Sequence, residues 1–75
     1  MRKEKVRSEW LQLSDEAGRL ETEVHRLDVQ LMKAARNPSI SHIEFLAIAE
    51  RTDATRRDLW DVWAQMRGIR ETVET

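Results

Sequence analysis

One apolar stripe constrains the fold of this chain more than any other feature. Between Val6 and Ala34 the apolar residues alternate at intervals of four and three: Val6, Trp10, Leu13, Ala17, Leu20, Val24, Leu27, Leu31 and Ala34. A helix is the regular structure that places such positions on one side, so the spacing predicts a long helix with a heptad seam. The rest of the chain must supply a surface against which this seam can pack.

The first helix is expected to end before a proline. Residues 37–41 read Asn-Pro-Ser-Ile-Ser. Because Pro38 lacks an N–H and disfavours helix at the residue before it, we predict a helix over about 3–36 and a loop over 37–41. Asn37 can take the left-handed conformation that closes many helices.

A second helix is predicted over about residues 42–72. Ser41 and Glu44 have the spacing of a capping box, and Ile40 and Phe45 that of a hydrophobic staple. A second stripe follows, in which two threonines interrupt the apolar series: Phe45, Ile48, Thr52, Thr55, Leu59, Val62, Met66, Ile69 and Val73. The short connection between two long helices predicts an antiparallel hairpin.

The hairpin places Gly18 opposite Trp60. With the loop centred near residue 39, residues that face each other have numbers adding to about 78. Glycine inside a helix costs up to about 1 kcal/mol relative to alanine. We therefore predict that Gly18 leaves room for an indole of its own chain or of a partner chain. The alternative is an exposed Gly18 that only loosens the helix.

More apolar surface is available than one hairpin can bury. Leu11, Gly18, His25 and Met32 recur beside the first seam and widen its apolar stripe. With 75 residues and no cysteine, a single domain over 1–75 has a small core and no disulfide, which leaves oligomerisation to stabilise it. The expected fold class is all-α: an antiparallel two-helix hairpin that dimerises into a four-helix bundle. The predicted dimer or partner interface contains Trp10, Leu11, Gly18, Met32, Trp60, Trp63 and Met66.

Catalytic and metal-binding patterns are missing from the sequence. His25 and His42 belong to no metal-ligand motif, no glycine-rich phosphate loop occurs, and there is no cysteine nucleophile. We therefore predict no catalytic residues, no metal and no cofactor. A competing enzyme hypothesis starts from Arg56, which lies near the second seam and could line a pocket against His25 or Arg26. In general architecture, this would resemble the all-helical chorismate mutases, which bind a dicarboxylate among arginines. Alternatively, Arg56 and Arg57 pair with nearby surface carboxylates, namely Asp53, Asp58 and Asp61.

Nucleic-acid binding is the other alternative. In architecture alone, the predicted dimer resembles the Rop-type plasmid regulators, which are RNA-binding hairpin dimers. The basic residues that would reach the open end of the hairpin are Arg2, Lys3, Lys5, Arg7, Arg67 and Arg70. The net charge of −1 and the acidic residues along the first helix argue against this role.

The favoured function is therefore a small, non-enzymatic protein–protein interaction module. We expect a homodimer that acts as a regulator or inhibitor, by docking a helical face with tryptophan anchors on a partner protein and occluding it. No apolar run approaches the roughly 20 residues that span a bilayer, and no apolar signal core follows the basic N-terminus. We thus expect no membrane partner and a cytoplasmic location.

Overall fold

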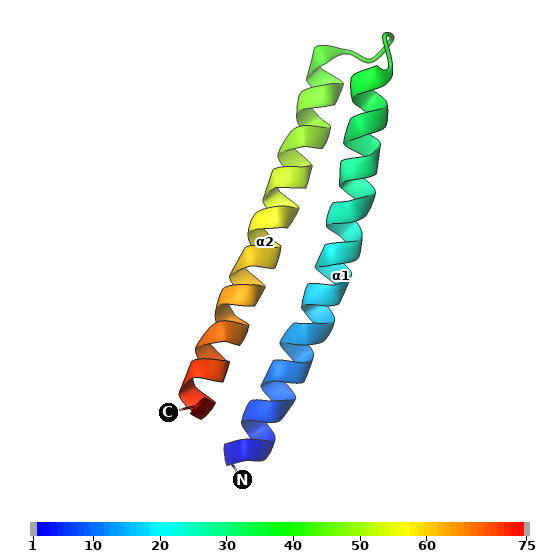
Figure 1. Cartoon of the computed structure of the whole chain (residues 1–75). Helices are drawn as coiled ribbons and strands as arrows, with labels where there is room; N and C mark the ends of the chain where they lie inside the picture. The colour runs from blue at the N-terminus through cyan, green and yellow to red at the C-terminus, as the bar shows by residue number, and fades with distance from the viewer. Residues whose placement is uncertain (1, 75) are drawn as a thin grey trace.

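Two long helices account for nearly all of the structure, a computed structural model of the whole chain that describes the backbone of residues 2–74 and the side chains of residues 5–71. Helix α1 spans Arg2–Arg36 and helix α2 spans His42–Glu74, and the two run antiparallel, side by side (Figure 1). The predicted all-α hairpin is confirmed, and the predicted ends of the helices agree with the observed ones to within two residues.

Helix α2 begins at the predicted cap. The backbone N–H of Glu44 donates to Oγ of Ser41 at 3.1 Å, and the N–H of Phe45 donates to the Ser41 carbonyl at 3.0 Å. The Ser41 hydroxyl thus satisfies the Glu44 N–H, which has no partner inside the helix, and the Ser41 carbonyl accepts the first helical hydrogen bond. Ile40 and Phe45 are both partly buried and line one small hollow together with Ala34, as a hydrophobic staple requires.

The end of α1 differs from the left-handed cap suggested for Asn37. No non-glycine residue of the described chain has a positive φ. Instead, the Asn37 N–H donates to the Ala34 carbonyl at 3.1 Å, and the Asn37 side-chain oxygen accepts from the Ser39 N–H at 3.0 Å. An asparagine side chain that bonds the backbone two residues on turns the chain without a left-handed residue, and Pro38 fits at the centre of that turn.

A thin seam between the helices forms the core. Its buried residues are Ala17, Leu27, Thr52, Leu59, Val62 and, near the loop, Ala34. Ala17 packs with Leu59 and Val62, and the partly buried Leu13, Leu20, Val24 and Met66 pack around them. Residue numbers add to 76 for Ala17 and Leu59 and to 79 for Ala17 and Val62, which agrees with the sum of about 78 expected from the loop.

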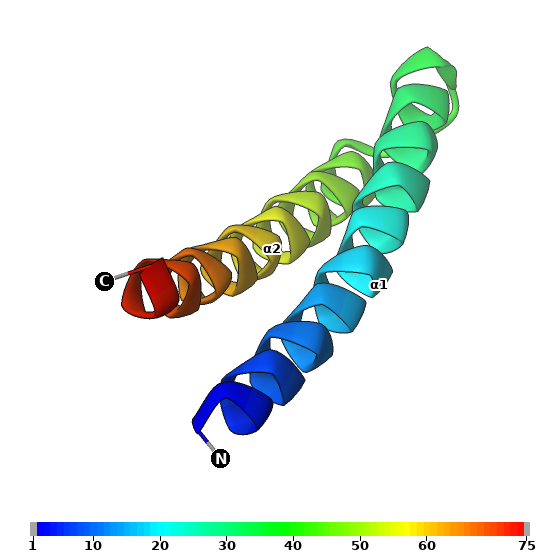
Figure 2. The ribbon, with the colours of Figure 1, turned by 60° about the horizontal axis from the view of Figure 1, so that its bottom comes forward.

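The hairpin is a rod rather than a compact domain. Its dimensions are 57 × 15 × 14 Å, and its radius of gyration is 16.9 Å. A compact domain of this length would have a radius of gyration of about 11 Å. Within the described chain, α1 and α2 form a single layer, and no third element covers either broad face (Figure 2). Each helix therefore buries only the stripe that faces its neighbour.

Candidate interaction surface

Electrostatic interactions between the helices identify the two broad faces of the rod. One guanidinium nitrogen of Arg56 in α2 donates to both carboxylate oxygens of Asp28 in α1, at 2.8 and 3.0 Å. On the other face the charge of Arg51 in α2 acts on Glu23 in α1, without a hydrogen bond between them. The hydrogen bond from Arg26 is the main cause that lowers the pKa of Glu23, and the charge of Arg51 adds to it. In the heptad repeat Asp28 and Arg56 occupy e positions, whereas Glu23 and Arg51 occupy g positions, on the opposite side of the seam.

Most of the exposed large apolar side chains lie on the face of the Asp28–Arg56 pair. They occupy b positions, or in one case an e position, and their exposed fractions are 50% for Leu11, 55% for Met32, 44% for Leu46, 58% for Trp60 and 42% for Trp63. Position b follows e around each helix, so these side chains share one side of the rod. We call this surface the tryptophan face. It contains Leu11, Gly18, His25, Asp28 and Met32 of α1 and Leu46, Asp53, Arg56, Trp60, Trp63 and Arg67 of α2.

Two further exposed apolar residues lie at or beyond the border of this face. Trp10 occupies an a position, 40% exposed, where the seam meets the tryptophan face. Ile43 lies at an outer f position in the first turn of α2 and is 81% exposed. None of the exposed large apolar side chains of the described chain occupies a c or g position.

The opposite face is polar. Near the open end of the rod it has a shallow hollow with Val6, Leu13 and Ile69 at its base. Polar residues and one glycine form the rim: Glu9, Gln12, Glu16, Gln65 and Gly68. The hollow is open to solvent along its length, and its charged side chains are both acidic. It therefore lacks the enclosure and the converging polar groups that a small-molecule site requires.

The predicted interface residues divide into two groups. Trp10, Leu11, Met32, Trp60 and Trp63 are exposed, whereas Met66 packs against the core of its own chain. Gly18 is also exposed, and a Cβ built on it would have nothing within 4 Å. The expectation that Gly18 accommodates an indole of its own chain is therefore wrong. An indole from a partner chain stays a prediction.

Arg56 has a different partner from those expected. Sequence reasoning placed it beside His25 or Arg26 in a pocket, or beside a surface carboxylate of its own helix. It reaches across the rod to Asp28 instead, because both occupy e positions and these meet in an antiparallel pair. Asp28 was not a candidate, although its e position could have identified it. The guanidinium of Arg56 is bound to this carboxylate, and the arginine-lined pocket stays a prediction.

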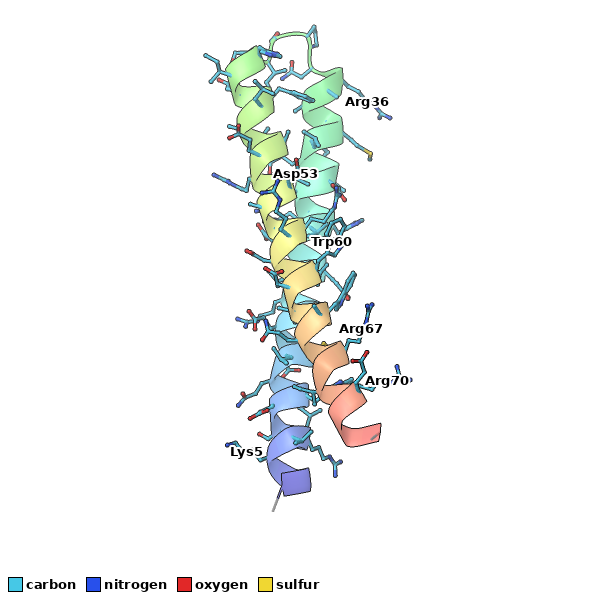
Figure 3. The ribbon with its side chains drawn as sticks, turned by 90° about the vertical axis from the view of Figure 1, so that its left-hand side faces the viewer. Lys5, Arg36, Asp53, Trp60, Arg67 and Arg70 are labelled. Atoms are coloured by element: carbon cyan, nitrogen blue, oxygen red, sulfur yellow. The ribbon has the colours of Figure 1, made fainter. Side chains whose placement is uncertain are left out.

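Four of the basic residues proposed for nucleic-acid contact have described side chains, and Lys5 lies on the opposite side of the rod from the other three. Figure 3 shows Arg67 and Arg70 projecting from the same side of the rod as Trp60, whereas Lys5 projects from the opposite side. Arg7 occupies an e position and so shares the side of Arg67 and Arg70. The side chains of Arg2 and Lys3 lie outside the described residues.

Among the described side chains of residues 5–71, no three from His, Cys, Asp or Glu are grouped so as to hold a metal ion. Neither helix, over the same residues, has an apolar stretch long enough to cross a bilayer. Comparison with protein-family models, curated proteins and solved structures finds no significant match. The geometry alone therefore defines the class of the molecule: an antiparallel α-helical hairpin whose exposed large apolar side chains lie mostly on one face.

Proposed function

We propose that this chain is a non-enzymatic protein–protein interaction module whose tryptophan face binds a second copy and completes a four-helix bundle. The observation that carries this proposal is the one-sided distribution of the exposed apolar side chains. Exposed large apolar side chains that gather on one face of a small protein indicate an interface. An isologous two-fold contact lets one such face cover itself, and a layer of two helices on another layer of two is a four-helix bundle.

The solvent-exposed area of the single hairpin is consistent with a partner as large as a second copy of the chain. The chain exposes 6362 Å², whereas a compact monomer of 8.9 kDa would expose about 4,800 Å². The excess is roughly 1,500 Å² per chain, or about 3,000 Å² for a pair, which falls in the range of permanent homodimer interfaces. A second copy therefore removes about as much surface from water as the single hairpin exposes in excess.

The composition of the face favours a protein partner. Tryptophan is the residue type most enriched among interface hot spots, and Trp60 and Trp63 lie one helical turn apart. Positive and negative side chains both occur on the face, with Arg56 already bound to Asp28. A phosphate backbone favours a continuous row of cations instead. The role of regulator or inhibitor that occludes a partner protein, and the cytoplasmic location, stay predictions.

The test measures self-association of the full chain. We expect sedimentation equilibrium at micromolar concentrations to give about 18 kDa, twice the chain mass of 8.9 kDa. Trp60→Ala combined with Trp63→Ala should weaken the dimer at least about 100-fold, because each substitution removes a buried aromatic anchor. Both side chains are exposed in the single hairpin, so circular dichroism should show an unchanged helix content.

Ile43→Ala is the matched control, since it removes a large exposed apolar side chain of the same helix outside the tryptophan face. It should leave the dissociation constant within about threefold. A chain that is monomeric at 100 µM, or a dimer that both tryptophan substitutions leave intact, would overturn the proposal. Sedimentation that shifts only when RNA is added, with a steep dependence on salt, would favour the nucleic-acid alternative instead.

A further inference from the structure

The arrangement of two hairpins follows from the residues along their b positions. Helix α1 carries Leu11, Gly18, His25 and Met32 there, and α2 carries Leu46, Asp53, Trp60 and Arg67. Residues at the same height on the rod have numbers that add to about 79, as Ala17 and Val62 do. The two rows therefore match in height: Leu11 with Arg67, Gly18 with Trp60, His25 with Asp53, and Met32 with Leu46.

A two-fold dimer that buries this face has two arrangements. If the symmetry axis runs along the rod, both loops lie at one end. Helix α1 then covers the partner's α2, and each residue of the partner keeps the same height along the rod. If the axis crosses the rod, the loops lie at opposite ends, and each helix covers its own copy with heights reversed. The two arrangements bring different side chains together.

The arrangement with both loops at one end makes complementary contacts. Trp60, which is 58% exposed, lies opposite the partner's Gly18, where there is open space around the missing side chain. Met32 lies opposite the partner's Leu46, so two exposed apolar side chains cover each other. His25 lies opposite the partner's Asp53, which can accept a hydrogen bond from the imidazole.

Charges also complement each other in this arrangement. Within one chain, Asp28 and Arg56 lie at different heights along the rod, and the Arg56 side chain spans this difference to bind Asp28. With heights preserved, the partner's Arg56 lies at that same offset from Asp28. The two ion pairs then form one alternating network of two arginines and two aspartates, so the charges that the dimer buries are balanced.

At full overlap of the two rods, the arrangement with opposite loops makes poor contacts. With the two rows in full overlap, Trp60 lies opposite the partner's Asp53, and Leu46 lies opposite the partner's Arg67. The large indole then has no space to enter, because Gly18 lies opposite His25 on the other pair of helices. Leu11 and Met32 make the one favourable apolar contact of these rows.

We infer that the dimer has both loops at the same end, with Trp60 of each chain packed into the space over Gly18 of the other. This inference rests on the proposed self-association and specifies its geometry. It also gives Gly18 a role that the single hairpin does not explain. The space left open by the absent side chain receives the indole of the partner's Trp60.

Spin labels distinguish the two arrangements. The chain has no cysteine, so Ser39→Cys introduces a single label site in each loop. With loops at one end, dipolar spectroscopy should give a short distance, because the axes of the two helix layers lie about 8–10 Å apart and only the label side chains add to this. With loops at opposite ends, the distance approaches the 57 Å length of the rod. Arg19→Cys, near the middle of α1 on the polar face, is the control, because its distance is similar in both arrangements.

Substitution at Gly18 tests the contact itself. Gly18→Leu should weaken the dimer at least about 10-fold, whereas Gly68→Leu should not, although it too places leucine at a helical glycine with nothing within 4 Å of its Cβ. The leucine acts by displacing the indole of Trp60. In a chain that already carries Trp60→Ala, Gly18→Leu should therefore not raise the dissociation constant of the dimer further. A dimer with a long loop-to-loop distance, or one that tolerates Gly18→Leu, overturns the inferred arrangement and leaves the self-association standing. A monomer overturns both.

Discussion

Thr52 shows how a polar residue can occupy a seam position. From the sequence, Thr52 and Thr55 interrupt the stripe of the second helix. In the structure Thr52 is 1% exposed, as is Leu27, and its hydroxyl donates to the Ile48 carbonyl at 2.8 Å. A buried hydroxyl that finds an acceptor in the preceding turn of its own helix costs little, so the seam continues through the threonine.

Thr52→Val should leave the free energy of unfolding unchanged or raise it by up to about 1 kcal/mol. Valine has the same shape and a similar helix propensity, and the Ile48 carbonyl keeps its helical hydrogen bond. Thr52→Ala should instead lower stability by about 1–2 kcal/mol, because it leaves a cavity. Urea denaturation followed by circular dichroism measures both. A valine variant less stable than the alanine variant would show that the hydroxyl itself holds the seam.

At the scale of the elements, local signals define the hairpin. The seam of α1 is apolar almost throughout, whereas α2 begins at a strong cap and carries a more polar stripe. The bounds of both helices were predictable because periodicity, proline and the capping serine act within a few residues. The conformation of Asn37 at the end of α1 was not predictable. An asparagine can end a helix with a left-handed backbone or with a hydrogen bond from its side chain to a following N–H, and the structure has the second.

Ser41→Ala should lower the free energy of unfolding by about 1 kcal/mol, since the Glu44 N–H loses its acceptor. Ser39→Ala is the matched control: Ser39 lies in the same loop, and its bond to Asn37 uses the backbone N–H, which alanine retains. Thermal denaturation of the three chains at one concentration checks this. Equal losses in both variants would mean that the serine side chain does not cap α2.

For the whole molecule, the ratio of surface to core is the dominant property. The rod buries a single seam, and its exposed tryptophans, leucines and methionine gather on one broad face. A dimer that covers this face couples the stability of the hairpin to its concentration, because partner binding stabilises the folded state by mass action.

The midpoint of thermal unfolding should therefore rise by several degrees between 1 and 100 µM chain. The variant with Trp60→Ala and Trp63→Ala should unfold at a lower temperature that does not depend on concentration. Differential scanning calorimetry over this range measures both. A concentration-independent midpoint in the unsubstituted chain would contradict a dimer coupled to folding.

Local sequence patterns account for the two helices, the bend between them and the register of the seam. Each of these depends on spacing or capping over a few residues, so the order of the amino acids suffices to predict it. The open space at Gly18 and the degree to which each apolar side chain stays exposed depend on how each helix is rotated about its axis. That rotation results from packing both seams at once, and so only the folded pair decides it.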